Sequence, residues 1–219
     1  MRGVVRVVFV GLCCVMVVPA IAEAKVKPFP TQIVLVGADI ESISGELRSA
    51  GKGCLSERTV NFVDVSTSVV FHTTTTDRDG RFTIALADIP FGTSAVRVRV
   101  TPKRSGSRLC EQDTARVTFD EATLTGGPGD GAFQGILTSS VNACEPNRLI
   151  SLYEVSSDEA VFVGFNYTDA SGEWTIAQAS GNYEARADLA LIGGGDAYFY
   201  CEPLVSPRWS FEEPPEGSA

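Results

Sequence analysis

Four of the six cysteines, together with one histidine, offer this chain its widest choice of chemistry. Cys54, Cys110, Cys144 and Cys201 are isolated from one another, and His72 is the single histidine. Zinc is held by thiolates and imidazoles, but its ligands usually come as close pairs. A cysteine nucleophile needs a free thiol beside a base. The spacing therefore favours structural disulfides over a metal site or a catalytic thiol.

A serine nucleophile is the other chemistry to weigh. No serine lies in a Gly-x-Ser-x-Gly sequence, and His72 has no obvious nucleophile near it in the chain. A catalytic triad is defined by geometry across a fold, and nothing in this spacing predicts one. We expect no catalytic residues, no metal and no cofactor, and hence a protein that is not an enzyme.

Two segments, Thr76–Gly80 and Thr168–Gly172, combine aspartate with glycine. Calcium is the functional alternative, but it needs roughly six to eight oxygen ligands. No further ligand series follows Gly80, and the second segment has Ser171 where the first has a second aspartate. Aspartate accepts hydrogen bonds from its own turn, and glycine supplies a positive φ. Both segments are predicted to be hairpin turns.

These residues recur because the chain contains one pattern twice. Glycine to cysteine is nine residues and cysteine to arginine is four in both copies, while the cysteine pairs are 56 and 57 residues apart. The matching positions are Gly45 and Gly135, Cys54 and Cys144, Arg58 and Arg148, Phe82 and Trp174, and Cys110 and Cys201. The repeat predicts one domain in two copies and selects the disulfides Cys54–Cys110 and Cys144–Cys201. Each bridge stabilises its domain by about 4 kcal/mol in the chain-entropy model.

Alternation of apolar and polar residues indicates that strands position these groups. Residues 95–100 and 183–188 alternate in this way, and no long segment after residue 22 has helical spacing. A period of two is typical of strands with one buried face. We predict an all-β fold of two tandem antiparallel Greek-key β-sandwiches, each with one disulfide, over residues 30–122 and 132–207. The glycine-rich Thr125–Gly131 between them is expected to be a flexible joint.

Several larger side chains have both a binding and a structural interpretation. Arg58 and Arg148 precede strands, and we expect each to lay its stem on the sandwich and pair with a nearby carboxylate. Tyr167 and Tyr198 are candidate ligand-stacking residues for a sugar. Trp174 is expected to lie in the core, as aromatic residues at strand spacing usually do.

The N-terminal segment has the features of a signal peptide. Arg2 and Arg6 precede an apolar run, and small residues at Ala20 and Ala22 predict cleavage after residue 22, with Ala24 as the second choice. A transmembrane anchor is the alternative, but the run is shorter than the roughly 20 apolar residues that a bilayer requires. A lipoprotein signal at the cysteines of this run is disfavoured because a leucine precedes them.

The charge of the mature chain argues against nucleic acid as a partner. Removing residues 1–22 takes away two positive charges, so the net charge becomes −9 − 2 = −11. Phosphate contacts need clustered Lys and Arg. No later segment is apolar enough for membrane insertion, and the acidic, proline-rich residues 208–219 are predicted to be a disordered tail. We expect a secreted or extracytoplasmic protein, in a periplasm or at a cell surface.

The order Gly-x-(Val/Leu), Cys, Arg-x-(Val/Ile)-x-(Phe/Leu), Thr-Asp-x-x-Gly and Cys resembles the carboxypeptidase regulatory-like domain. That domain belongs to the transthyretin-like, or prealbumin-like, β-sandwiches, and the cysteine-bridged form resembles one found in secreted bacterial proteins. The resemblance covers both copies and implies a seven-stranded Greek-key sandwich with an accessory role. Its enzyme branch, the hydroxyisourate hydrolases, depends on histidines and a C-terminal Tyr-Arg-Gly-Ser. This chain has one histidine and lacks that ending, so no catalytic residue carries over.

The sequence thus predicts an exported, non-catalytic interaction or structural module whose partner is a protein or a glycan. The alternative is a carbohydrate- or small-ligand-binding protein that uses the aromatic residues of the second copy. An enzyme is the third interpretation. Two exposed rings side by side among Tyr167, Tyr198 and Trp174 would favour the sugar, and buried rings would favour the structural role.

Overall fold

The computed structural model describes residues 26–211 except 52, 130, 158 and 179, and it leaves the side chain of residue 211 undescribed. The predicted signal peptide (1–22) and residues 212–219 of the predicted tail lie outside these residues. The described chain is all-β, with two short 3₁₀ helices, η1 (Leu86–Asp88) and η2 (Asn142–Cys144). Within the described ranges, no helix has the length and hydropathy to cross a membrane.

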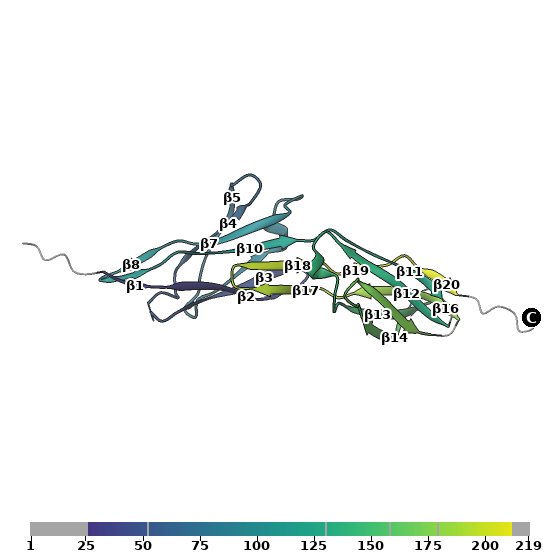
Figure 1. Ribbon diagram of the computed structural model, residues 1–219. Helices are drawn as coiled ribbons and strands as arrows, with labels where there is room; N and C mark the ends of the chain where they lie inside the picture. Colours follow the sequence, from purple (N-terminus) through teal and green to yellow (C-terminus); the bar gives the residue numbers. More distant parts are fainter. Residues whose placement is uncertain (1–25, 52, 130, 158, 179, 212–219) are drawn as a thin grey trace, which may run out of the picture.

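The first copy forms most of one half of an elongated molecule, which we call lobe one (Figure 1). Its two sheets have the strand orders β2-β3-β6 and β17-β18-β10-β7-β4-β5. The strands from the first copy are β2 (Thr31–Ala38), β3 (Ser42–Ser49), β4 (Thr59–Asp64), β5 (Val70–Thr75), β6 (Arg81–Ala85), β7 (Ala95–Val100) and β10 (Asp113–Phe119). A small sheet, in the order β1-β9-β8, projects at the far end and contains β1 (Lys27–Phe29), β8 (Lys103–Ser105) and β9 (Arg108–Cys110).

The second copy forms lobe two, with the same division into two sheets. One sheet has the order β11-β12-β15, and the other has the order β14-β13-β16-β19, with β20 also paired to β16. The strands of lobe two are β11 (Ala122–Gly129), β12 (Ala132–Ser139), β13 (Leu149–Val155), β14 (Ala160–Tyr167), β15 (Glu173–Ala177), β16 (Gly181–Ala187), β19 (Leu204–Val205) and β20 (Trp209–Phe211). The second copy also contains β17 (Ala190–Gly194) and β18 (Ala197–Cys201), which lie in the larger sheet of lobe one.

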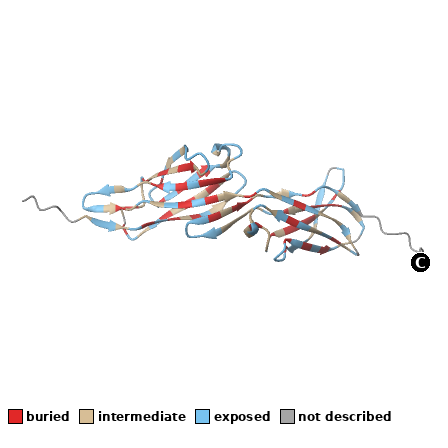
Figure 2. Ribbon diagram, turned by 45° about the horizontal axis from the view of Figure 1, so that its top comes forward, coloured by how far each residue is buried: buried red, intermediate tan, exposed pale blue. Residues whose placement is uncertain are grey.

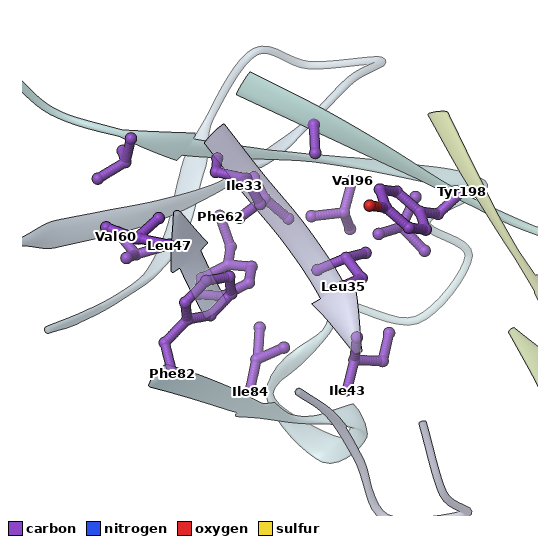
Figure 3. Packing of buried hydrophobic residues seen from close by; sticks show 14 of the residues in the cluster. Ile33, Leu35, Ile43, Leu47, Val60, Phe62, Phe82, Ile84, Val96 and Tyr198 are labelled. Atoms are coloured by element: carbon purple, nitrogen blue, oxygen red, sulfur yellow. The ribbon is translucent and has the colours of Figure 1, made fainter. Parts of the chain in front are cut away.

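Each lobe has its own apolar core between its two sheets, where the buried residues gather (Figure 2). In lobe one, Ile33, Phe62 and Val96 meet from opposite sheets (Figure 3). Strand β7 alternates buried valines with exposed arginines, as a half-buried strand requires. The predicted alternation is confirmed for residues 95–100. It is wrong for residues 183–188, where Glu184 is buried along with Tyr183 and Ala185.

The glycine that begins each repeat makes room for the aromatic residue that follows the turn. Gly45 pairs across strands with Phe82, and Gly135 pairs with Trp174. A Cβ would lie 2.4 Å from the Phe82 ring in the first case and 2.7 Å from the Trp174 ring in the second. A side chain at Gly45 would displace the Phe82 ring, and one at Gly135 would also lie 2.0 Å from the carbonyl oxygen of Thr125. These contacts account physically for glycine at this position of the repeat.

One hairpin of the second copy belongs to lobe one. Strand β18 pairs in parallel with β10, so β17 and β18 extend the sheet of the first copy. Tyr198 and Tyr200 from β18 lie in the apolar core of lobe one (Figure 3 labels Tyr198). Residues 190–201 fall inside the range predicted for the second domain, yet they complete the first. The two lobes are therefore interlocked rather than independent.

Two predicted flexible segments contain paired strand. Most of Thr125–Gly131 lies in β11, which pairs with β12, so the expectation of a flexible joint there is wrong. Gly126 is needed in that strand because a Cβ would lie 2.9 Å from the Trp174 ring. The predicted tail also starts too early. β20 pairs with β16, and Trp209 packs against the core of lobe two.

Candidate functional site

Both predicted disulfides are present. Cys54–Cys110 has a Cα–Cα distance of 5.3 Å, and Cys144–Cys201 has one of 5.5 Å. The buried carboxylate of Asp120 lies beside the second pair. Because those two sulfurs are bonded to each other, they do not offer thiolates to a metal. The four cysteines are structural, as the repeat predicted.

Each repeat buries an arginine beside its disulfide. The guanidinium of Arg58 donates to the carbonyls of Cys54 (2.8 Å), Thr101 (2.7 Å) and Glu111 (2.8 Å). Burial lowers the pKa of the Arg58 side chain. The predicted structural role is supported, but the expected carboxylate partner is wrong: backbone carbonyls, with their dipoles aimed at the cation, take its place.

Arg148 makes the equivalent contacts in lobe two. It donates to the carbonyls of Cys144 (3.3 Å), Asp188 and Glu202 (2.9 Å). Burial is the main cause that lowers its pKa, with an opposing effect from the carboxylates of Asp120, Asp188 and Glu202. In both lobes the arginine donates to the carbonyl of the first cysteine and to the carbonyl of the residue that follows the second cysteine. It therefore links the two chain segments that the disulfide joins.

The two aspartate–glycine segments are turns, as predicted. Asp169 Oδ1 accepts hydrogen bonds from the Ser171 hydroxyl and from the backbone N–H groups of Ser171 (2.8 Å) and Glu173 (2.9 Å). Together these bonds lower the pKa of Asp169. Gly80 and Gly172 have φ values of 85° and 80°. The carboxylate lone pairs point into the turn, which is their structural use.

His72 lies on β5, where its ring contacts Phe62 and Asp88. Its ring packs edge-on against Phe62, and Nδ1 lies 3.5 Å from a carboxylate oxygen of Asp88. Neither contact involves a serine or a cysteine.

The two candidate ligand-stacking tyrosines lie in different lobes. Tyr198 is 4% exposed in the core of lobe one, where it cannot stack on a ligand. Tyr167 is 54% exposed on β14 of lobe two. Trp174 is buried, as expected. The proposed pair of side-by-side rings is therefore not formed, and only Tyr167 remains available.

Tyr167 instead belongs to a row of rings that the sequence interpretation did not single out. Phe162, Phe165 and Tyr167 on β14 are each about half exposed, and Tyr153 on β13 adjoins them. Ring centroids are 5.8 Å apart for Tyr153 and Phe162, 6.5 Å for Phe162 and Phe165, and 6.3 Å for Phe165 and Tyr167. We call these four residues the aromatic strip.

A β-bulge brings the strip onto one face of the sheet. Phe162 and Phe165 are three residues apart, so they would point to opposite faces of a regular strand. The register shifts so that Leu152 pairs with Gly164 while Tyr153 pairs with Phe162, which leaves Val163 as an extra residue. The extra residue restores the shared face. This spacing explains why alternation in the sequence does not reveal the strip.

Charged side chains border the strip on β16. The guanidinium of Arg186 lies over the ring of Tyr153, 4.2 Å from its centroid. Arg186 also pairs with Glu184, whose other oxygen lies 3.5 Å from Arg208. The cation nearest to the strip is therefore already held by a ring and a carboxylate.

In lobe one, the corresponding edge strand β5 has the same bulge but lacks the exposed rings. There Phe62 pairs with His72 and Val63 pairs with Val70, so Phe71 is the extra residue. The positions equivalent to Phe162, Phe165 and Tyr167 are Val70, Thr73 and Thr75. The bulge belongs to the repeat, whereas the aromatic strip is specific to lobe two.

A second apolar feature lies on lobe one, beside the segment that leaves β18. A hollow of about 470 Å³ is lined by Ile40, Phe91, Phe119 and Tyr200, with the carboxylate of Glu202 at its side. Burial, together with the charge of Asp120, raises the pKa of Glu202. Ile40 and Phe91 come from connecting segments, so this hollow lacks the open strand edge that accompanies the aromatic strip.

Comparison with known proteins gives weak structural likeness and no family. No family model matches the chain, and no curated protein matches it. Among solved structures, the chain is similar to Tp47, the 47-kilodalton lipoprotein of Treponema pallidum, at 12% identity and a TM-score of 0.29. The match covers 82% of this chain and 50% of that one, so this chain spans about half the length of Tp47. A likeness at this score carries no argument about function.

Proposed function

We propose that this chain is an exported, non-catalytic tandem β-sandwich protein that acts outside the cytoplasm as an interaction or structural module. The aromatic strip on β14 is its contact surface. The observation that carries the proposal is the contrast between the lobes: one repeat places half-exposed rings where the other places valine and threonine. Apolar groups gathered on an exposed surface mark an interaction site.

Export is supported by the disulfides and by the N-terminal sequence. Paired cysteines persist in oxidising compartments such as the periplasm and the cell exterior. The sequence of residues 1–22 adds a basic start, an apolar run and small residues at the cleavage position. Both features favour a secreted or extracytoplasmic location.

The strand order supports the finer fold proposal. In lobe one, the first, second and fifth main strands (β2, β3, β6) face the fourth, third, sixth and seventh (β5, β4, β7, β10). Lobe two repeats this division. Such an order is compatible with a seven-stranded Greek-key sandwich of the transthyretin-like or immunoglobulin-like kind. The resemblance to carboxypeptidase regulatory-like domains remains part of this proposal.

A carbohydrate- or small-ligand-binding protein is the second candidate, since exposed rings also stack on sugars. The ring geometry gives it less support. Phe162 and Phe165 are inclined by 22°, but Phe165 and Tyr167 by 88°, so the strip offers no shared plane for successive sugar rings.

The proposed function is tested by affinity co-purification of the tagged chain from the extracytoplasmic fraction of the producing cell. One variant gives β14 the lobe-one residues (Phe162→Val, Phe165→Thr, Tyr167→Thr). A control variant changes Thr73→Ala and Thr75→Ala on β5. We expect partners to be lost with the first variant and kept with the second. Partners that survive both changes would rule out the strip as the contact surface.

A further inference from the structure

We infer that the open edge of β14 accepts an extended polypeptide segment as an added strand, one that alternates apolar with basic side chains. This inference rests on the proposed function, because it names the partner class for the same surface. Four observations support it: the open edge, the rings beside it, the charge around it and the orientation of the rings.

Strand β14 lies at the end of its sheet. It pairs with β13, and within the described residues no strand pairs with its other edge. Thr168 N–H donates to the carbonyl of Arg148, so the backbone of Thr168 faces β13. Successive residues of an antiparallel strand direct their backbone groups to alternate sides, so the backbone groups of Tyr167 and Phe165 face away from β13, toward the open edge. An unpaired strand edge is a template for pairing with another chain.

The structure also limits the register of such a strand. The Tyr167 N–H on the open edge donates to the Asn166 side chain at 2.8 Å. That bond closes one end of β14, and the backbone of Phe165 is the open position next to it. An added strand is therefore expected over Ala160–Phe165.

The strip would lie beside the side chains of an added strand. Facing side chains on adjacent strands contact each other directly, and aromatic and β-branched residues pair well in this way. Phe162 and Phe165 supply the larger apolar surface, each with more than half of its area exposed. Apolar residues at alternate positions of the added strand would cover these two rings.

The charge around β14 is acidic. The sequences of β13, β14 and β15 contain Glu154 and Glu173 and no lysine or arginine, and Glu159 immediately precedes β14. Arg186, on the next strand, is held by Glu184 and Tyr153. Electrostatic complementarity therefore favours lysine or arginine at the remaining positions of the added strand.

Ring orientation favours a polypeptide over a glycan. Phe162 and Phe165 are nearly parallel at 22°, but Tyr153 and Phe162 are inclined by 70°, and Phe165 and Tyr167 by 88°. Successive sugars in an extended chain need ring faces in one plane, whereas the side chains of a strand can meet both edges and faces. The combination of these rings with an open backbone edge matches strand addition.

The test uses the mature chain and a synthetic peptide of alternating valine and lysine, matched in length to β14. A second peptide carries a methyl group on every backbone nitrogen, which removes its N–H donors and keeps its charge. A third replaces lysine with glutamate. Isothermal titration gives affinities, and hydrogen exchange of the Phe165 amide reports the location. Cellohexaose and chitohexaose serve as glycan probes.

We expect the valine–lysine peptide to bind and to slow exchange at Phe165. Methylation, the glutamate replacement, and the change of β14 to lobe-one residues should each weaken binding at least about tenfold, equivalent to about 1.4 kcal/mol. The Thr73→Ala and Thr75→Ala control should bind as the wild type does.

Three results would overturn the inference. Equal binding of methylated and unmethylated peptides would show side-chain contact without an added strand, and the proposed function would survive. Equal binding of the glutamate peptide would contradict the basic partner. Binding of a hexasaccharide at β14 with no binding of the valine–lysine peptide would show that the surface binds a glycan and not a polypeptide strand. Because the first two comparisons use the wild-type chain, they do not depend on how a variant folds.

Discussion

The Arg148 side chain donates to the carbonyl of Cys144, four residues earlier, from a position where it is almost fully buried. Its other contacts reach the carbonyls of Asp188 and Glu202, on the far side of the disulfide. Arg58 repeats the arrangement with Cys54 and Glu111. A buried guanidinium thus fixes the closed end of each disulfide loop.

Replacing this arginine should destabilise its lobe. Arg148→Met removes the donors and leaves several buried carbonyls without partners, each of which costs roughly 1–3 kcal/mol when unsatisfied. We expect a loss of about 3 kcal/mol or more in the free energy of unfolding, measured by urea denaturation. Arg148→Lys should restore little of this, since an ammonium cannot form the planar fork. Wild-type stability in Arg148→Met would contradict the role.

The two turn glycines should differ in their tolerance of alanine. Both have positive φ, but a Cβ at Gly172 would lie 2.2 Å from the carbonyl oxygen of Leu137, against 3.2 Å from that of Leu47 for Gly80. We expect about 1 kcal/mol of destabilisation for Gly80→Ala and about 3 kcal/mol for Gly172→Ala. Thermal unfolding of both variants checks the order, and a larger loss for Gly80→Ala would be inconsistent with it.

Tyr198 should stabilise lobe one, although it belongs to the second repeat. Tyr198→Ala leaves a cavity in the lobe-one core and should cost about 3 kcal/mol, as large-to-small core changes do. Hydrogen exchange should show faster opening of β4 and β7. The exposed Tyr167→Ala is the matched control and should change stability by less than about 0.5 kcal/mol. Unchanged exchange in β4 and β7 would mean that the β17–β18 hairpin does not stabilise the core of lobe one.

Asp169 should contribute to acid sensitivity. Hydrogen bonds from the Ser171 hydroxyl and the turn backbone lower its pKa in the folded state. A folded pKa below the unfolded value of about 3.9 gives stability that is present above that value and lost as the pH falls below it. Urea unfolding between about pH 6 and about pH 3 should show a smaller loss for Asp169→Asn than for the wild type. An equal loss in both proteins would place the acid sensitivity elsewhere.

The repeated features were predictable because their spacing occurs twice in the chain. The disulfides Cys54–Cys110 and Cys144–Cys201 and the positive φ of Gly80 and Gly172 follow from motifs present twice. The place of β17 and β18 was not predictable in this way. Alternation identifies a strand but not its neighbour, so Tyr198 could not be assigned to the core of the other repeat.

The candidate site was predicted only in part, for a related reason. Tyr167 was identified from its residue type, but the strip also depends on the bulge at Val163, which brings Phe162 and Phe165 to one face. A one-residue shift in pairing reverses the face of every side chain beyond it. The equivalent bulge at Phe71 shows that this shift is a property of the repeat.

The most direct test of β14 as the contact surface is site-specific photocrosslinking in the producing cell. A benzophenone side chain replaces Phe165 in one variant and Thr73, its lobe-one equivalent, in another. We predict a protease-sensitive adduct from position 165 and none from position 73. The adduct should weaken when Phe162→Val and Tyr167→Thr are added. Equal adducts from both positions, or none from position 165, would contradict the account.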